Sequence, residues 1–354
     1  MKKMITRRQF MAAAGVVAAH SERQLEVLAY INQEQKAEIK ALAESGKINI
    51  HVSEEPDIFY IRIFLAAGGN NAEVTIRTDH TNVTCIKKNG ATVLEKPIVP
   101  AEEEAKSLWR IEDVLDAARN MPLDNVKHLL QRQIDFNMAI SKEGLTNDYG
   151  ASIGKILLRR DPDSLRIRAR ASAAAGSDAR MNGCSLPVVI VSGSGNQGMT
   201  ASLPVVEYAK ELNVGYEKMI RAVALSDLVT IHLKSGIGRL SAYCGAVSAG
   251  CGCGAGIAYL YGGGLKEIEH TIVNSIAIDS GMVCDGAKAS CAAKIASAVD
   301  AGILGYHMYK NGQQFRAGDG LVTKGVEETI RNIGILAREG MRETDREILH
   351  IMCD

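Results

Sequence analysis

The sequence predicts an α+β N-terminal region, an antiparallel meander with helices, followed by a mainly α-helical domain rich in glycine and alanine. Segments in which apolar and polar residues alternate are confined to the first part of the chain. Longer segments with apolar residues at helical spacing follow, and glycine-rich loops separate them. Because strands come first and helices later, the order argues against alternating βαβ units and a doubly wound sheet.

Two helical segments precede the predicted strands. Residues 11–19 are apolar and small, as in a core helix, although Thr6 to Phe10 ahead of them also imitate a twin-arginine export signal. Residues 22–45 carry helical spacing, and Gly46 stands where a helix C-terminal cap is expected. The alternation of an antiparallel meander then begins. Its predicted strands are residues 47–52, 59–66, 73–78 and 82–87, separated by Pro56, Gly68 to Asn71 and Asn89-Gly90.

An acidic stretch, residues 100–104, reads as a linker or as the first turn of a helix. It places a domain boundary near residue 104, which divides the chain into an α+β domain, 1–104, and a mainly helical domain, 105–354. The helices predicted in the second domain are residues 111–118, 124–142, 203–212, 217–232, 265–278, 289–301 and 325–339.

Charge and composition exclude several kinds of partner. The 354 residues hold 41 basic and 41 acidic side chains, and aromatic residues make up only 5%, so neither a nucleic acid nor an anionic membrane surface is expected as a partner. A small neutral or zwitterionic substrate fits better. Residues 241–264 carry no charge and are long enough to span a bilayer, but eight of them are glycine. Because each glycine weakens a helix by about 1 kcal/mol relative to alanine, a buried loop and core helix is predicted there instead.

Five of the eight cysteines fall within 48 residues, which points to a soft-metal site more than to a disulfide framework. Two metal sites are compatible with the spacing: a four-thiolate zinc site, or an iron-sulfur cluster held by three or four thiolates. The alternative is that these cysteines are buried and inert. The five are Cys244, Cys251, Cys253, Cys284 and Cys291.

A glycine- and serine-rich loop follows the apolar run 186–191. It lacks the Lys-Ser/Thr end of a P-loop and does not fit the dinucleotide fingerprint, so a carboxylate is the expected ligand. The loop concentrates donors without a positive side chain of its own. A flexible turn is the alternative. The residues predicted to line the carboxylate pocket are Ser192, Gly193, Ser194, Asn196 and Gln197.

Four motifs, in order, resemble the L-cysteine desulfidase family, which is related to the α domain of the iron-sulfur L-serine dehydratases. The resemblance runs from about residue 11 to the C-terminus. The motifs are Ser192 to Gly198, Lys234 to Gly245 (KSGIGRLSAYCG), Gly281 to Lys288 (GMVCDGAK) and Glu327 to Ile348 (EETIRNIGILAREGMRETDREI).

The resemblance implies a 4Fe-4S cluster held by Cys244, Cys284 and Cys291, with one iron open to substrate as a Lewis acid. It implies a cytoplasmic lyase that eliminates the β-substituent of a small amino acid. The expected reaction converts L-cysteine to pyruvate, ammonia and sulfide. His80 and Asn82, in a family-like His-Thr-Asn segment, are the further substrate-binding residues expected, and a homo-oligomer is compatible with this assignment.

The sequence departs from the family in one respect. Family members begin with a further segment whose Cys-Thr-Glu-Pro cysteine is thought to act as the base, and no cysteine precedes Cys85 here. The catalytic base is therefore not assigned, and impaired activity is expected. Cys85 is either a substitute base or a core residue of a strand. Two further alternatives stay open: a catalytically silent homologue acting as an amino-acid-binding or partner subunit, and a native start that lies upstream.

Overall fold

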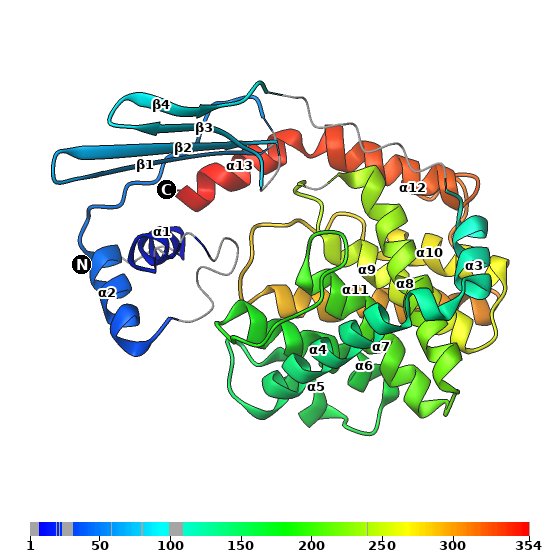
Figure 1. Cartoon of the computed structure of the whole chain (residues 1–354). Helices are drawn as coiled ribbons and strands as arrows, with labels where there is room; N and C mark the ends of the chain where they lie inside the picture. The colour runs from blue at the N-terminus through cyan, green and yellow to red at the C-terminus, as the bar shows by residue number, and fades with distance from the viewer. Residues whose placement is uncertain are drawn as a thin grey trace.

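The computed structural model describes residues 7–18, 20, 22, 31–57, 59–78, 81–98, 109–238 and 240–353. Figure 1 shows a small lobe, made of two helices and one sheet, beside a larger body built of helices. The last helix extends from the helical body toward the sheet. This arrangement confirms the predicted fold class. The boundary predicted near residue 104 lies outside the described residues.

The sheet is an antiparallel meander, as predicted, in the order β1-β2-β3-β4. Two-residue turns, Gly68-Gly69 and Asn89-Gly90, join β1 to β2 and β3 to β4, and all four residues have the positive φ that such hairpin turns require. The strands are β1 Tyr60–Ala67, β2 Asn70–Arg77, β3 Val83–Lys88 and β4 Ala91–Glu95.

The strand prediction was wrong at both ends of the meander. Residues 47–52 form no strand, because no neighbouring strand pairs with them and Ile48 packs against the two N-terminal helices instead. Ala91–Glu95 was not predicted, yet it forms β4, since the Asn89-Gly90 turn folds this short alternating segment back onto β3.

The two N-terminal helices are α1 Arg7–Val17 and α2 Gln33–Glu44. They pack through small and apolar side chains, chiefly Ala13, Ala14 and Ile39. Asn32 and the side chain of Gln35 form a reciprocal capping box at the start of α2. Gly46 has a φ of 72°, which confirms the predicted end of this helix.

The helical body contains every helix predicted there and three that were not, α5, α6 and α13. Helix α6 is buried on almost every face, so its alanine-rich sequence carries no amphipathic period. Helix α7 begins eight residues before the prediction and contains Pro204 in its interior. The helices are α3 Ile111–Asn120, α4 Lys127–Thr146, α5 Ile153–Arg160, α6 Leu165–Met181, α7 Gly195–Glu211, α8 Tyr216–Ile237, α9 Gly245–Leu260, α10 Leu265–Asp279, α11 Cys291–Lys310, α12 Val326–Ile335 and α13 Arg342–Cys353.

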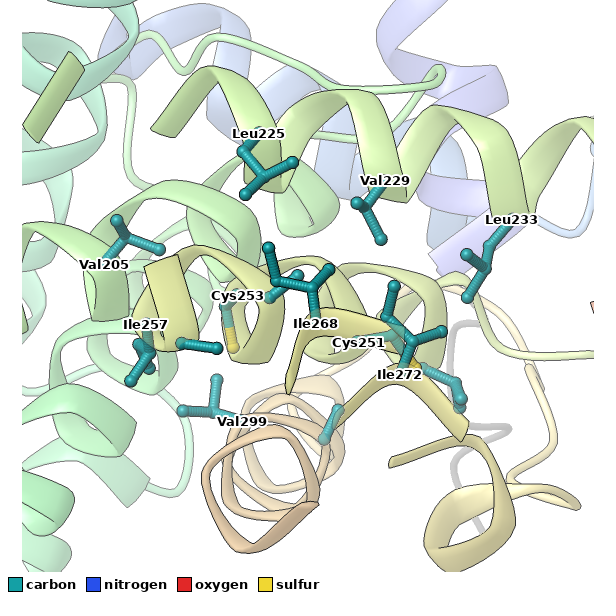
Figure 2. Close-up of a cluster of buried hydrophobic side chains, with 14 of the residues drawn as sticks. Val205, Leu225, Val229, Leu233, Cys251, Cys253, Ile257, Ile268, Ile272 and Val299 are labelled. Atoms are coloured by element: carbon teal, nitrogen blue, oxygen red, sulfur yellow. The ribbon is translucent and has the colours of Figure 1, made fainter. Parts of the chain in front are cut away.

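Helix α9 lies at the centre of the core, as Figure 2 shows around Cys251 and Cys253. Its glycines let neighbouring helices approach to backbone contact: a Cβ on Gly250 would lie 2.3 Å from the Ala298 carbonyl oxygen of α11. The glycine-rich, uncharged run is therefore a core helix, as predicted. In the part of the chain that the structure covers, no helix is both long and apolar enough to cross a membrane.

Asp227 on α8 is a carboxylic acid buried in this core, and it should make stability depend on pH. Burial raises its pKa to about 7, while the hydrogen bond that Gln133 Nε2 donates at 3.0 Å acts in the opposite direction. The unfolded chain ionises this group near pH 3.9, so stability is lost as pH rises from about 4 to 7. Asp227→Asn should gain on the order of 2 to 4 kcal/mol over wild type at pH 8 and almost nothing at pH 4. Urea unfolding of both proteins at the two pH values checks this; an equal difference at both would contradict it.

Candidate functional site

The structure brings two of the predicted cluster cysteines together by a short antiparallel contact. Cys244 is the N-cap residue of α9, and its N–H donates to the Met282 carbonyl at 3.0 Å. In return, the Cys284 N–H donates to the Ala242 carbonyl at 2.5 Å. The start of α9 is thereby tied to the loop after α10, which places the two thiols side by side.

The hydrogen bond between the two thiols moves their pKa values in opposite directions. Cys244 hydrogen-bonds to Cys284; this bond, followed by burial, raises the pKa of Cys244. The same hydrogen bond lowers the pKa of Cys284 to about 6, with smaller contributions from the Gly286 N–H and from the charges of Lys294 and Lys234, while burial opposes the shift. Cys284 is therefore the thiolate of the pair near neutral pH.

The third cysteine, Cys291, is the first residue of α11. Its sulfur makes a long hydrogen bond, 3.6 Å, to the Gly286 carbonyl, and Gly286 has the positive φ that this turn needs. The pKa of Lys288 is lowered, first by burial and then by the charge of Lys294. The charges of Cys291, Cys284 and Cys244 act in the opposite direction. The three predicted ligands therefore all act electrostatically on one partly buried ammonium group.

Sequence reasoning missed the charged residues of this loop. Asp285 accepts from both Lys288 and Lys294, and Lys294 also donates to the Val283 carbonyl at 2.7 Å. Asp285 and Lys288 lie inside the Cys-Asp-Gly-Ala-Lys motif, so the sequence motif could have indicated that they belong to the site. Lys294 comes from the second turn of α11, and nothing in the local sequence marks it.

The cysteine spacing allowed two metal sites, a four-thiolate zinc site and an iron-sulfur cluster. Among the described residues, no three His, Cys, Asp or Glu side chains converge so as to hold a single metal ion. Cys251 and Cys253 are 1% and 0% exposed inside the core, and burial raises the pKa of Cys253 to about 12, which removes the four-thiolate zinc site. A 4Fe-4S cluster binds each thiolate at a separate iron, so it does not need three side chains that converge on one ion, and three cysteines match it in number and kind.

The predicted carboxylate loop is a tight turn that starts a helix. Ser192 and Gly193 have φ values of 47° and 84°, and Val191 and Ser194 exchange backbone hydrogen bonds at 3.1 and 3.2 Å. Ser194 is the N-cap residue of α7, and its hydroxyl caps no backbone N–H. The turn therefore presents a hydroxyl beside the N-terminus of a long helix, where backbone N–H groups favour an anion.

Gln197 connects this loop to the thiols. Its side chain is buried, and a Cβ on Gly245 would lie 2.5 Å from its Nε2 atom, so the amide lies directly against the residue after Cys244. Gln197 Oε1 has no hydrogen-bond partner within the described part of the chain. A buried, unsatisfied amide oxygen beside the thiol cluster is available to a ligand that donates a hydrogen bond.

The loop has a positive neighbour, which the sequence did not predict. Arg180, in the last turn of α6, donates from Nη1 to Asn196 Oδ1 at 3.2 Å. Its guanidinium also lies against Gly195, where an added Cβ would be 2.7 Å from Nε. The residues of the loop itself carry no positive charge, as expected, but Arg180 of α6 brings a positive charge to it.

Of the other predicted substrate residues, the structure describes Asn82, which lies beside the sheet. The amide of Asn82 donates to the Arg77 carbonyl at 3.0 Å and to Thr78 Oγ1 at 3.1 Å, which closes the connection between β2 and β3. His80 lies outside the described residues. Cys85 is half-buried on β3, opposite Thr75. A role of these residues in substrate binding or proton transfer stays a prediction.

Cys244 and Cys291 lie at the N-termini of two central helices, α9 and α11. The chain therefore belongs to a class of helical proteins that carry thiols at the ends of core helices. A family model described as the serine dehydratase alpha chain matches residues 22–350. Since this range includes both the carboxylate loop and the three cysteines, the chain belongs to the serine dehydratase alpha chain family.

Several longer relatives match nearly the whole of this chain. A UPF0597 protein of Desulfitobacterium hafniense is 52% identical over 343 residues, which is 96% of this chain and 80% of the relative. UPF0597 proteins of Lachnoclostridium phytofermentans and Finegoldia magna are both 46% identical, over 96% and 97% of this chain and 82% of each relative. These names state no activity.

Proposed function

We propose that this protein is an iron-sulfur-dependent β-elimination lyase whose substrate is a small amino acid, L-cysteine before others. The observation that carries the proposal is the hydrogen-bonded pair of thiols, Cys244 and Cys284, which lies beside the buried amide of Gln197. The charge of Cys291 acts together with this pair on Lys288. Membership of the serine dehydratase alpha chain family supports elimination chemistry in general, and the desulfidase-like motifs favour sulfide as the leaving group.

Cys244, Cys284 and Cys291 would hold a 4Fe-4S cluster. When bound, such a cluster supplies an iron that acts as a Lewis acid toward the substrate. The positive side chains of Lys288 and Lys294 favour the thiolate forms of the ligands over the thiol forms. Cys251 and Cys253 contribute to the core and take no part.

The carboxylate loop would orient the amino acid. The Ser194 hydroxyl and the first N–H groups of α7 are donors for the substrate carboxylate, and Arg180 adds positive charge behind them. Gln197 Oε1 is an acceptor for the substrate ammonium group on the side of Cys244. Together these groups fix the amino acid by both of its charged ends.

The overall reaction breaks the Cα–H, Cβ–S and Cα–N bonds of the substrate and consumes one water. Loss of the Cα proton and cleavage of the Cβ–S bond release hydrogen sulfide and leave aminoacrylate. Its imine tautomer takes up water and yields ammonia and pyruvate. Cys85 and His80 are the residues of this sequence that the family-like motif offers as acceptors of the Cα proton, and Cys85→Ser and His80→Asn test them.

The second candidate function is an amino-acid-binding or partner subunit without turnover. One observation favours it: the Cys244 and Cys284 thiols satisfy each other by a hydrogen bond, an arrangement that needs no metal. Such a protein would bind L-cysteine or L-serine through the carboxylate loop and release neither sulfide nor pyruvate.

Ser194→Ala should weaken amino-acid binding. A hydrogen bond to a charged group contributes about 1 to 3 kcal/mol, so the dissociation constant or KM should rise by roughly 5- to 150-fold. Ser192→Ala compares the two serines that were predicted to line the pocket: Ser192 is exposed on the same turn, so its loss should weaken binding less than the loss of the Ser194 hydroxyl. An equal dissociation constant or KM for wild type and Ser194→Ala would show that the loop is a turn that binds no ligand.

The function is tested by assaying pyruvate and sulfide from L-cysteine with protein reconstituted anaerobically with iron and sulfide, with L-serine as the parallel substrate. The proposal predicts stoichiometric pyruvate and sulfide from L-cysteine. Pyruvate formed from L-serine but not from L-cysteine would support the assignment as a lyase and would change the proposed substrate to L-serine. Amino-acid binding without either product would support the second candidate and overturn the first.

A further inference from the structure

The two outer edges of the sheet differ in how they are protected against pairing. Strand β4 has five residues, its register with β3 shifts between Ile86 and Lys87, and it ends at Glu95. Short length, an irregular register and charge are the features by which sheet edges resist further strands. Strand β1 has eight residues, pairs with β2 without a shift and carries one charged side chain, Arg62.

The apolar residues of β1 are uncovered. Ile61, Ile63 and Leu65 share one face of the sheet and are 39%, 48% and 49% exposed, and Phe64 on the other face is 59% exposed. Within the described residues, no segment pairs with the outer edge of β1. A long, regular, apolar edge of this kind is a template for another strand.

The sequence of β1 specifies what that strand must look like. A pairing strand needs apolar residues opposite Ile61, Ile63 and Leu65, and it must place no positive charge opposite Arg62, which already binds Glu73 at 2.8 Å. Strand β1 meets both conditions itself. In an antiparallel pair of two copies centred on Ile63, Ile61 of each copy faces Leu65 of the other.

In the same register, Arg62 of each copy faces Phe64 of the other. No like charges oppose each other, and the guanidinium lies within reach of an aromatic ring, an arrangement that stabilises a cross-strand pair. Shifting the register by one residue would align the Ile61-Ile63-Leu65 face of one copy with the Arg62-Phe64 face of the other, so the apolar face would no longer be continuous. The two sheets would join into one of eight strands with a continuous apolar face.

We propose that β1 is a homodimer interface, in which two copies of this chain pair antiparallel about a two-fold axis at Ile63. The occupant of the edge is a second copy because the self-pairing satisfies both the apolar pattern and the charge requirement of the edge. The proposal stands apart from the lyase function, since no residue of the thiol site belongs to β1.

The test is the mass of the full chain in solution at about 100 µM and about 1 µM, by light scattering after gel filtration. Wild type should have twice the chain mass at the higher concentration. Ile63→Lys puts a charge on the two-fold axis and should weaken association at least 100-fold. The matched control, Val93→Lys, changes an even more exposed residue on the other edge strand, β4, and should leave the dimer intact.

Circular dichroism of Ile63→Lys should match wild type, because the side chain is half exposed and helices dominate the signal. A monomeric wild type at the higher concentration overturns the proposal, as does a dimer that survives Ile63→Lys or is lost in Val93→Lys. A monomer whose β1 amides become protected from hydrogen exchange only when the additional sequence of the Desulfitobacterium relative is supplied would also overturn it, and would assign the edge to that sequence.

Discussion

Cys284→Ser should abolish both the bound iron and the turnover of the reconstituted protein. Cys284 is the member of the coupled thiol pair with the lowered pKa, so it is the thiolate best prepared to bind iron. A serine hydroxyl is a harder and far less acidic ligand. We expect iron per chain to fall to background and the rate of pyruvate formation to fall by about 10³-fold or more, as when a group acting as part of a unit is removed.

The control for this variant is Cys184→Ser, since Cys184 is likewise a free cysteine but lies outside the thiol cluster. It should keep iron and activity within about twofold of wild type. Loss of iron in both variants would mean that thiol oxidation during preparation, and not ligation, governs the iron content. Full iron and full turnover in Cys284→Ser would remove this cysteine from the ligand set.

Lys288→Met should weaken both the hold on iron and the reaction. The ammonium group of Lys288 interacts with all three thiols, and without it the three negative charges face one another with less compensation. We expect kcat/KM to fall by roughly 10- to 100-fold, and iron to be lost to a chelator faster by a similar factor. Both rates are measured on anaerobic protein.

Lys288→Arg is the matched variant, because it keeps the charge and changes its shape. If charge is what matters, its iron retention should lie much closer to wild type than that of Lys288→Met. Equal behaviour of Lys288→Met and wild type would show that Asp285, which binds Lys288 and Lys294 together, already neutralises this lysine.

The sheet was predictable because its turns are encoded locally. Gly68-Gly69 and Asn89-Gly90 are residues that adopt positive φ. The first pair closes the predicted hairpin, and the second closes a hairpin between β3 and β4, a strand that was not predicted. The segment 47–52 shows the limit of this reasoning, since an alternating pattern does not supply a partner strand. The pairing of one segment with another is a property of the whole chain.

Most helices were predictable from the apolar face that they turn toward the core, but the short α5 and the exposed α13 were missed. Helix α6 was missed because it is buried nearly all round, so its sequence shows no period. The glycines of α9 were correctly assigned to a core helix, but the reason for them became clear only in the structure: Gly250 and Gly302 allow α9 and α11 to touch backbone to backbone.

The candidate site was predictable in its cysteines and not in its charges. Spacing left five cysteines as candidates, and the resemblance selected three of them; the structure brings two of these, Cys244 and Cys284, into hydrogen-bond contact. Lys294 and Arg180 come from other helices and reach the site only through the packing of the body. Long-range approach of this kind leaves no mark in a local motif.

The iron content of anaerobically prepared protein tests the central claim most directly. Iron and acid-labile sulfide are measured per chain, together with the visible absorption of the sample. The claim that Cys244, Cys284 and Cys291 hold a 4Fe-4S cluster predicts about four of each per chain and an absorption band that bleaches in air. Less than about one iron per chain after anaerobic reconstitution, with no visible band, would contradict it.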